Sequence, residues 1–216
     1  MKHPLFEKKL FLLDMDGTIY LDHELFDATL PFLHAVKEKG GKYLFLTNNS
    51  SKSVRAYVDK LKSMGIQATE EDFLTSTDAT IVYLHEHYAP TDKLYAFGTA
   101  SFREQLMEAG FTLTTDPEED VRALVMGFDT ELTFEKLEHA CILLGRGVDY
   151  IATNPDYVCP TWYGSVPDCG SVATILKTAT GREPRFIGKP HPEMIYLALE
   201  KEGIEKKDAV MIGDRV

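Results

Sequence analysis

The stretch FLLDMDGTIY, residues 11–20, decides the fold of this 216-residue chain. The apolar run at residues 10–13 predicts a buried strand, and Asp14 and Asp16 follow it at once with Gly17 behind them. In an open α/β sheet, ligands bind just beyond the carboxyl ends of the strands. The stretch therefore predicts a first strand whose end carries carboxylates placed for a ligand.

These two carboxylates leave several interpretations open. Together they could bind a hard cation such as Mg²⁺, which prefers oxygen ligands. Alternatively, one could attack an electrophile while the other moves a proton. Gly17 would let the backbone approach a phosphate, and the N–H groups of the turn could form an anion-binding nest. An Asp-Gly pair is also common in plain surface turns, which need no ligand.

The remainder of the chain alternates short apolar runs with amphipathic stretches. Further strands are predicted at residues 42–47, 93–98, 123–128, 150–154, 185–188 and 209–214. Helices are predicted at residues 27–41, 51–65, 100–110, 133–145, 170–181 and 192–203, the first two with Asp27 and Ser51 as N-caps. This alternation is typical of βαβ units, so we expect an α/β fold with a parallel sheet covered on both faces.

Composition narrows the function classes. The chain has 23 basic and 34 acidic side chains, a net charge of −11, which argues against a nucleic-acid partner but not against a small phosphorylated ligand. Its three cysteines include no CxxC pair, which argues against a disulfide framework or zinc site and favours a reducing compartment. The first apolar run is too short for a signal peptide or a membrane span, so we expect a cytoplasmic protein.

Other polar residues also follow predicted strands. Thr47 and Asn48 end the second strand, where they and nearby N–H groups could bind an oxyanion or simply form a capping loop. Lys189 follows the strand at residues 185–188; it could neutralise a phosphate or be solvated surface. Asp214 could share a cation with the first carboxylates or cap a helix. All of these positions converge on one sheet edge, which favours phosphoryl transfer.

The ordered set DMDGT, LTNNS, IGKP and MIGD resembles the haloacid dehalogenase superfamily of phosphatases. TNPD (residues 153–156) and PDCGSVATIL (residues 167–176) resemble its NagD and para-nitrophenyl-phosphatase branch. The resemblance implies a Rossmann-like core with a parallel sheet plus an inserted α/β cap. We expect the core at residues 1–79 and 186–216 and the cap at residues 80–185, with the second part of the core C-terminally incomplete.

Roles for the aspartates come from this resemblance. It implies that Asp14 is the nucleophile and forms an aspartyl-phosphate, while Asp16 protonates the leaving group and later activates water. It also implies a Mg²⁺ cofactor, bound by the carboxylates of Asp14 and Asp214 and by the backbone carbonyl of Asp16. If Asp16 protonates the leaving group, its pKa should be raised.

The phosphate-binding residues are expected to be Gly17, Thr47, Asn48 and Lys189. The resemblance implies that Thr47 and Lys189 hold the phosphoryl oxygens and that Lys189 also orients Asp14. Positive charge there would offset the repulsion between the nucleophile and an anionic phosphate.

The expected function is hydrolysis of a small phosphomonoester: a sugar phosphate, a nucleoside monophosphate or an aryl phosphate. A phosphotransferase or phosphomutase using the same aspartate remains an alternative, as does a phosphate- or metal-binding protein without turnover. The expected partner is a small phosphorylated metabolite, with no membrane and no nucleic acid. The resemblance allows a homodimer and leaves the oligomeric state open.

The cap residues carry weaker signals. Asn154, Asp156 and Gly170 could shape a substrate pocket, but turns around the nearby prolines are the favoured interpretation. Trp162 and Tyr163 could stack on a substrate ring or pack in the core.

Overall fold

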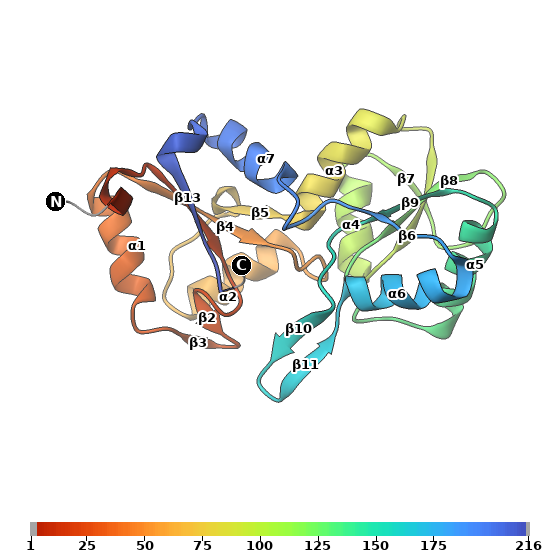
Figure 1. Cartoon of the computed structure of the whole chain (residues 1–216), viewed down its shortest axis with the longest axis horizontal. Coiled ribbons are helices and arrows are strands. Elements are labelled where there is room, and N and C mark those ends of the chain that lie inside the picture. The colour runs from red at the N-terminus through yellow and green to blue at the C-terminus, as the bar shows by residue number, and fades with distance from the viewer. Residues whose placement is uncertain (1–3, 215–216) are drawn as a thin grey trace.

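A computed structural model describes residues 4–214, which form two parallel sheets lying side by side (Figure 1). The first, called the core sheet, has the order β13-β1-β4-β5, with strands β1 (Leu10–Asp14), β4 (Lys42–Thr47), β5 (Phe73–Thr75) and β13 (Ala209–Ile212). The second, called the cap sheet, has the order β12-β9-β8-β6-β7, with strands β6 (Lys93–Phe97), β7 (Thr112–Thr114), β8 (Val121–Met126), β9 (Asp149–Ala152) and β12 (Arg185–Phe186). The predicted α/β fold with parallel sheets is confirmed.

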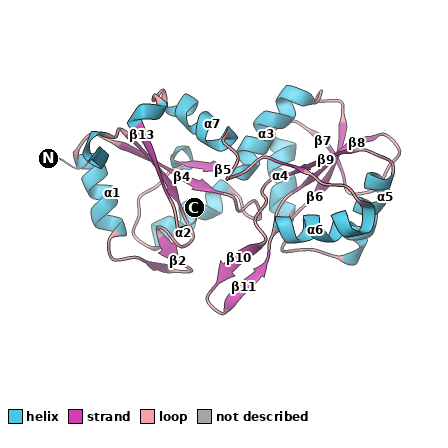
Figure 2. Cartoon of the chain, in the orientation of Figure 1, coloured by secondary structure: helices cyan, strands magenta, loops and turns pink. Residues whose placement is uncertain are grey.

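Helices cover both faces of each sheet, as Figure 2 shows. They are α1 (Thr29–Glu38), α2 (Val54–Ser63), α3 (Ser76–His87), α4 (Ala100–Glu108), α5 (Phe134–Gly145), α6 (Cys169–Thr180) and α7 (Glu193–Glu202). Each helix packs against apolar side chains on one face of a sheet. These side chains alternate along each strand, because successive residues of a strand point to opposite faces. Among residues 4–214, no helix combines the length and the apolar character that crossing a membrane requires.

Strand β1 lies inside the core sheet, with β13 on one side and β4 on the other. Leu10 and Leu12 point to one face, where α3 and α7 pack, while Phe11 and Leu13 point to the other, where α1 and α2 pack. All four side chains are buried. This burial fixes the register of β1 and so fixes where its last residue, Asp14, emerges.

One apolar cluster joins the two sheets. It runs from Leu12 and Leu46 of the core sheet through Leu84 of α3 to Ala96 and Val125 of the cap sheet. A separate cluster fills the far side of the cap sheet, under α5 and α6. Because a single buried cluster spans both sheets, the apolar packing holds the core and the cap together.

The chain leaves the core sheet through α3 and returns through β12, which pairs with β9 at one edge of the cap sheet. Helix α3 runs through the predicted boundary at residues 79/80, and β12 runs through the one at residues 185/186. The division into core and cap at those residues stays a prediction.

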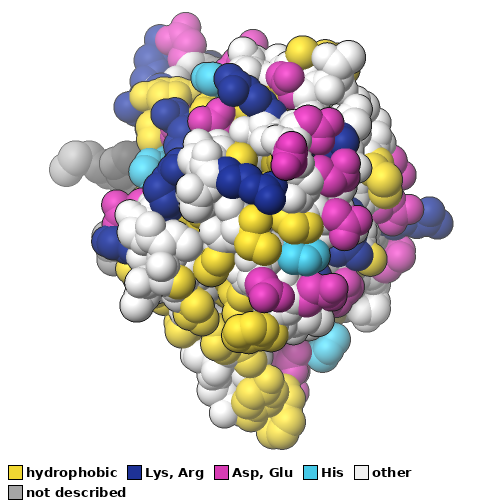
Figure 3. All heavy atoms as spheres, turned by 90° about the vertical axis from the view of Figure 1, so that its right-hand side faces the viewer, with side chains coloured by type: hydrophobic (Ala, Val, Ile, Leu, Met, Phe, Trp, Pro, Cys, Tyr) yellow, Lys and Arg dark blue, Asp and Glu magenta, His cyan; other side chains and the backbone are white. Residues whose placement is uncertain are grey.

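A hairpin projects from between the sheets. Its strands are β10 (Val158–Thr161) and β11 (Gly164–Pro167), and the short β2 (Tyr20–Leu21) and β3 (Glu24–Leu25) form a second antiparallel pair after β1. Hydrophobic side chains gather on the projection at the bottom of Figure 3. Trp162 and Tyr163 at the hairpin tip are 79% and 63% exposed, so, of the two alternatives for these side chains, packing in the core is wrong.

The helix starts differ from the sequence expectations. Helix α1 begins after Ala28 rather than Asp27, with no side-chain cap bond. Helix α2 is capped by Ser53, whose side chain accepts from the backbone N–H of Ala56, rather than by Ser51. The hydroxyl of Ser51 instead donates to Asn49 inside the loop that follows β4. Asp, Ser and Asn also form loop bonds, so a cap is hard to place among several of them.

Candidate active site

The site is built around the end of β1. Asp14 is the last residue of that strand, and its Oδ1 accepts a 2.9 Å hydrogen bond from the backbone N–H of Met15. The same oxygen lies 2.5 Å from Nζ of Lys189, which also donates to the carbonyl of Leu46 on β4, 3.1 Å away. The sequence thus places a carboxylate and a lysine, 175 residues apart, in direct contact.

Asp16 occupies a different environment from its neighbour. Burial raises the pKa of Asp16 above its ordinary value, the charge of Asp14 adds to the rise, and Lys60 opposes it. The Lys60 ammonium lies 3.9 Å from Oδ1 of Asp16 and over the ring of Tyr20, 3.7 Å from its centroid. A carboxyl with a raised pKa beside a second carboxyl in a different environment is the arrangement that separates an acid from a nucleophile.

The loop after β4 carries the predicted hydroxyl. Oγ1 of Thr47 accepts a 3.1 Å hydrogen bond from the N–H of Asn49, and Oδ1 of Asn49 accepts from both the N–H and the hydroxyl of Ser51. These local bonds hold the loop in a defined turn. Register places Leu46 opposite Asp14, so Thr47 lies one residue beyond the partner of the nucleophile candidate.

Asn48 sits between this loop and Lys189. Its Oδ1 accepts from the backbone N–H of Lys189, and its Nδ2 donates to the carbonyl of Lys189, both at 2.9 Å. The same Nδ2 lies 3.0 Å from Oδ2 of Asp156. The structure therefore places Asn48 beside Lys189, with its side chain directed at protein atoms.

A cleft of about 800 Å³ gathers most of the predicted residues. Asp14, Asp16, Thr47, Asn48 and Lys189 all border it. The cap contributes to the same cleft through residues of the hairpin base and the segments beside it, namely Asp156, Val158, Cys159, Pro160 and Asp168. The predicted residues Gly17 and Asp214 are not part of this lining.

Gly17 and Asp214 lie against each other beside the cleft. Gly17 has φ +84°, and a Cβ there would lie 2.6 Å from Oδ2 of Asp214. The N–H of Gly17 donates to the carbonyl of Tyr20, so its contribution is space for the carboxylate. Gly213 adjoins Asp14 in the same way, since a Cβ there would lie 3.3 Å from Cβ of Asp14.

This donor set fits a magnesium ion. Carboxylates of Asp14 and Asp214 and the carbonyl of Asp16 are the hard oxygen ligands that Mg²⁺ prefers, and the missing side chain of Gly17 leaves room beside Asp214. Across residues 4–214, no three Asp, Glu, His or Cys side chains group so as to hold a metal ion by themselves.

The carboxyl edge of the cap sheet is occupied by protein. Oγ of Ser50 accepts from the N–H of Phe128 at 2.7 Å and pairs with Oγ1 of Thr153 at 2.9 Å. The Thr99 hydroxyl donates to the carbonyl of Ser51 at 3.0 Å. The loop that follows β4 therefore fills the place where an α/β sheet would otherwise take a ligand.

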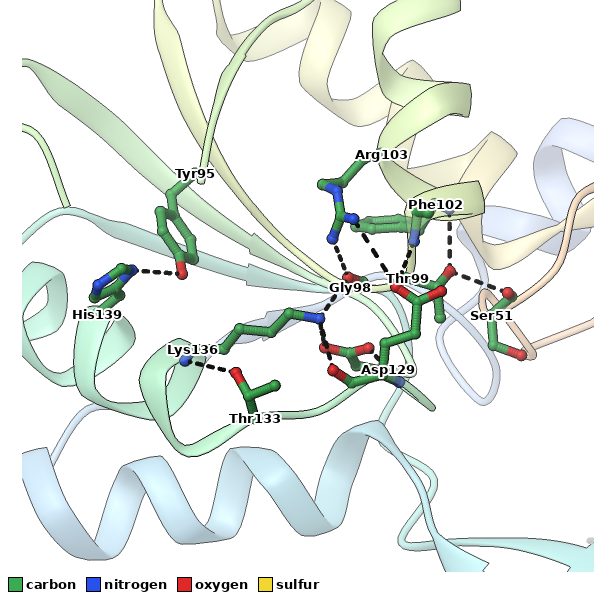
Figure 4. A network of polar contacts seen from close by, with 12 residues as sticks. Ser51, Tyr95, Gly98, Thr99, Phe102, Arg103, Asp129, Thr133, Lys136 and His139 are labelled. Carbon is green, nitrogen blue, oxygen red and sulfur yellow. Dashed lines mark hydrogen bonds and ion pairs between the residues drawn. The ribbon is translucent and has the colours of Figure 1, made fainter. Parts of the chain in front are cut away.

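An ion pair with a buried carboxylate lies beside this edge (Figure 4). Asp129, with a side chain 0% exposed, pairs with Lys136 at 2.7 Å and accepts from the N–H of Glu131. The Lys136 ammonium also donates to the carbonyls of Gly98 and Glu131. The buried carboxylate is thus paired and hydrogen-bonded, as a buried charge must be.

Comparison with known proteins agrees with the motifs. The family description "Haloacid dehalogenase-like hydrolase" matches residues 11–112, and a second description of similar hydrolases matches residues 186–216. An acid sugar phosphatase of Staphylococcus aureus is 36% identical over 206 residues, 95% of this chain and 78% of that protein. This chain belongs to the haloacid dehalogenase-like hydrolases. Its predicted membership of that superfamily is confirmed.

Solved structures place this hydrolase in the NagD and nitrophenylphosphatase branch. The 4-nitrophenylphosphatase of Thermotoga maritima is 39% identical, covers 99% of this chain and 81% of its own, and has a TM-score of 0.93. A glycerol phosphate phosphatase of Mycobacterium tuberculosis in complex with magnesium is 28% identical, covers 100% of this chain and 64% of its own, and has a TM-score of 0.91.

In this haloacid dehalogenase-like hydrolase, some contacts in the site could not be predicted from the sequence. Lys60 lies on α2, where a lysine is ordinarily solvent-exposed, and nothing in the local pattern directs it to Asp16. Asn154 is buried and holds the loop that follows β4, since its Nδ2 donates to the carbonyl of Asn48 at 2.8 Å. Gly170 permits a close backbone approach, because a Cβ there would lie 2.2 Å from the carbonyl oxygen of Pro155.

Proposed function

We propose that this chain is a Mg²⁺-dependent phosphatase that hydrolyses small phosphomonoesters through an aspartyl-phosphate on Asp14. The observation that carries the proposal is the 2.5 Å contact of Lys189 with Asp14, in a cleft that Asp16 also borders. The relatives support it, since they are named as acid sugar, 4-nitrophenyl and glycerol phosphate phosphatases.

In the first step, a carboxylate oxygen of Asp14 attacks the phosphorus atom. The bond from phosphorus to the ester oxygen breaks, and Asp16 gives its proton to that leaving oxygen. The raised pKa of Asp16 supports this role, because it favours the protonated form. The Lys189 ammonium and the Thr47 hydroxyl hold the phosphoryl oxygens and offset their charge.

In the second step, the Asp16 carboxylate takes a proton from water, and the resulting nucleophile attacks phosphorus. The bond from phosphorus to Asp14 breaks, which releases inorganic phosphate and restores both aspartates. Splitting one displacement into two gives each step a positioned nucleophile, with Asp16 serving first as acid and then as base.

The Asp14 and Asp214 carboxylates with the Asp16 carbonyl would hold Mg²⁺. The ion would supply positive charge that offsets repulsion between the nucleophile and an anionic phosphate. Asp14 would then be balanced by this ion and by Lys189 together.

The substrate is proposed to be small. Small ligands bind in clefts, and cap residues such as Val158 and Pro160 line this cleft together with Asp14 and Lys189. In the proposed division, residues 80–185 form the cap that shields the reacting centre from bulk water. The odd number of cysteines and the lack of a CxxC pair in the sequence favour a reducing compartment, and so a cytoplasmic location.

The test is phosphate release from 4-nitrophenyl phosphate, glycerol phosphate and a panel of sugar phosphates. We expect activity with Mg²⁺, loss with EDTA, recovery on adding Mg²⁺ again, and a loss of about 1,000-fold or more in Asp14→Asn. Asp59→Asn, an exposed change on α2, is the matched control and should keep full activity. Activity that survives either EDTA or the Asp14 change would refute the mechanism.

The same assay separates hydrolysis from transfer. A phosphatase passes the phosphoryl group to water even when a sugar acceptor is present, whereas a phosphotransferase or mutase forms a new sugar phosphate. Product analysis with a free sugar in excess should yield inorganic phosphate only. Accumulation of a phosphorylated acceptor would favour the transferase.

A further inference from the structure

The Asn48 side chain makes an unusual set of contacts with one other residue. Its amide pairs with both main-chain groups of Lys189, accepting from the N–H and donating to the carbonyl, each at 2.9 Å. A carboxamide has two N–H donors, and hydrogen bonds to Lys189 and to Asp156 Oδ2 account for both. The amide thus has no further donor to offer a phosphate.

The main chain of Asn48 is held as well. Its carbonyl accepts from the Ser76 hydroxyl at 2.6 Å and from Nδ2 of Asn154 at 2.8 Å, and both donor residues are fully buried. Asn48 itself is 8% exposed. Asn48 therefore lies where three segments meet: the end of β4, the start of α3 and the segment between β9 and the hairpin.

The segment before Lys189 is shaped to allow this contact. A Cβ at Gly188 would lie 2.6 Å from Oδ1 of Asn48 and 2.6 Å from the carbonyl of Thr153. A side chain at position 188 would therefore push the two segments apart. The close approach that lets Asn48 bind the Lys189 main chain depends on this glycine.

Lys189 is consequently fixed at both ends. Its ammonium contacts Asp14 and the carbonyl of Leu46, while its main chain is bound by Asn48. A lysine side chain is long and flexible, so the position of its ammonium depends on where the main chain is held. A shift of about 1 Å in a catalytic group can cost about 100-fold in rate.

We propose that Asn48 is a positioning residue that acts through the main chain of Lys189, an inference that rests on the proposed phosphatase function. Its side chain holds Lys189 where the ammonium meets Asp14 and the phosphoryl group. Asp156 in turn holds the Asn48 amide, which ties this alignment to the cap.

A double-mutant cycle on the full chain tests the route of action. We expect Asn48→Ala to lower kcat/KM on 4-nitrophenyl phosphate by about 100-fold in the natural background. In a Lys189→Ala background the same change should cost less than about threefold, because the group that it positions is gone. Equal losses in both backgrounds would overturn the proposal and show direct contact with the phosphate or a merely structural role. Gln67→Ala, an exposed amide change, is the control.

An exchange variant separates positioning from cap attachment. In N48D/D156N, the residue 156 amide can donate to the residue 48 carboxylate, but residue 48 has no donor for the Lys189 carbonyl. We expect the exchange to recover most of the Tm lost in Asn48→Asp while kcat stays low. Recovery of kcat together with Tm would overturn the proposal.

A readout without turnover distinguishes this inference from the proposed function. The same cycle is measured on the Kd of inorganic phosphate by titration calorimetry, where Asn48→Ala should weaken binding only when Lys189 is present. A natural chain that cleaves no ester would refute the proposed function, while this binding cycle would still decide the role of Asn48.

Discussion

The core sheet and the cap sheet have the same parallel architecture, but their carboxyl edges differ. At the core sheet, Asp14, Asp16 and Lys189 border a cleft of about 800 Å³. At the cap sheet, the equivalent edge is filled by Ser50 of the neighbouring loop, which is 0% exposed and bonded to Phe128 and Thr153. Sheet topology alone therefore does not mark a site; a site also needs an edge that stays open.

The charged groups at the two edges differ in the same way. Asp129 and Lys136 have their hydrogen bonds satisfied within the cap, so the pair stabilises the fold. Asp16, in contrast, has a pKa raised by burial and lies two residues from Asp14, which contacts Lys189. Changes at the core edge should therefore affect chemistry, and changes at the cap edge should affect stability.

Among the changes that compare the two edges, the largest effect is expected from Asp16→Asn, which removes the proposed proton donor and should leave the fold intact. In a single turnover, formation of the aspartyl-phosphate should slow by about 100- to 10,000-fold with glycerol phosphate, whose alkoxide needs a proton. The loss should be smaller with 4-nitrophenyl phosphate, because nitrophenol is acidic enough to leave unprotonated. Rapid-quench kinetics with both esters measures this difference. Equal losses with both esters would show that Asp16 does not act as the acid.

At the cap edge, Asp129→Ala should cost about 2–3 kcal/mol of unfolding free energy, because it removes the carboxylate partner of the partly exposed Lys136 ammonium and the acceptor of the Glu131 N–H. Urea unfolding followed by circular dichroism measures the loss. Replacing both partners by apolar residues, in D129L/K136M, should cost less than the single change, since no unpaired charge remains. A single-variant loss below about 1 kcal/mol would show that the pair is solvated and that this edge is more open than the structure indicates.

Much of the core edge could be predicted from the sequence. Asp14 and Thr47 end the apolar strands β1 and β4, and in a parallel sheet such strand ends meet at one edge. The predicted strands at these places were found because their residues are buried on both faces and so form near-continuous apolar runs. Local sequence and global fold agree there. Lys189 follows β12, an edge strand of the cap sheet, so the expectation that its strand ends at the same sheet edge as the others is wrong; it reaches Asp14 from the cap side.

The rest of the site depends on contacts that no local pattern encodes. Ser50 meets Thr153 across 103 residues, and Asn48 meets Lys189 across 141. The hairpin was missed because its strands carry Pro160, Gly164 and Pro167, which are typical of turns. Polar side chains that bind distant backbone groups leave no periodic signal, so their partners appear only in the folded chain.

Ser50→Ala should have an intermediate effect. The change leaves the buried N–H of Phe128 without an acceptor, so we expect a loss of about 1–3 kcal/mol in unfolding free energy. Ser63→Ala, on the exposed end of α2, is the control and should change stability by less than about 0.5 kcal/mol. Denaturant unfolding of both variants measures the difference. Equal small changes would mean that the loop after β4 is not held by the cap sheet.

The smallest effect is expected at the hairpin tip, where the Trp162 ring meets the Tyr163 ring edge-on with 5.3 Å between the ring centroids. Trp162→Ala should change unfolding free energy by less than about 0.5 kcal/mol and kcat/KM on small esters by less than about twofold. Phe134→Ala, equally exposed on α5, is the matched control.

The hairpin makes this small effect informative, because its base and its tip differ in position. Val158, Cys159 and Pro160 at the base border the catalytic cleft, whereas the Trp162 side chain is exposed beyond it. A rise in KM for Trp162→Ala, absent in Phe134→Ala, would mean that the tip reaches the substrate. The whole hairpin, and not its base alone, would then contribute to substrate binding at the edge of the core sheet.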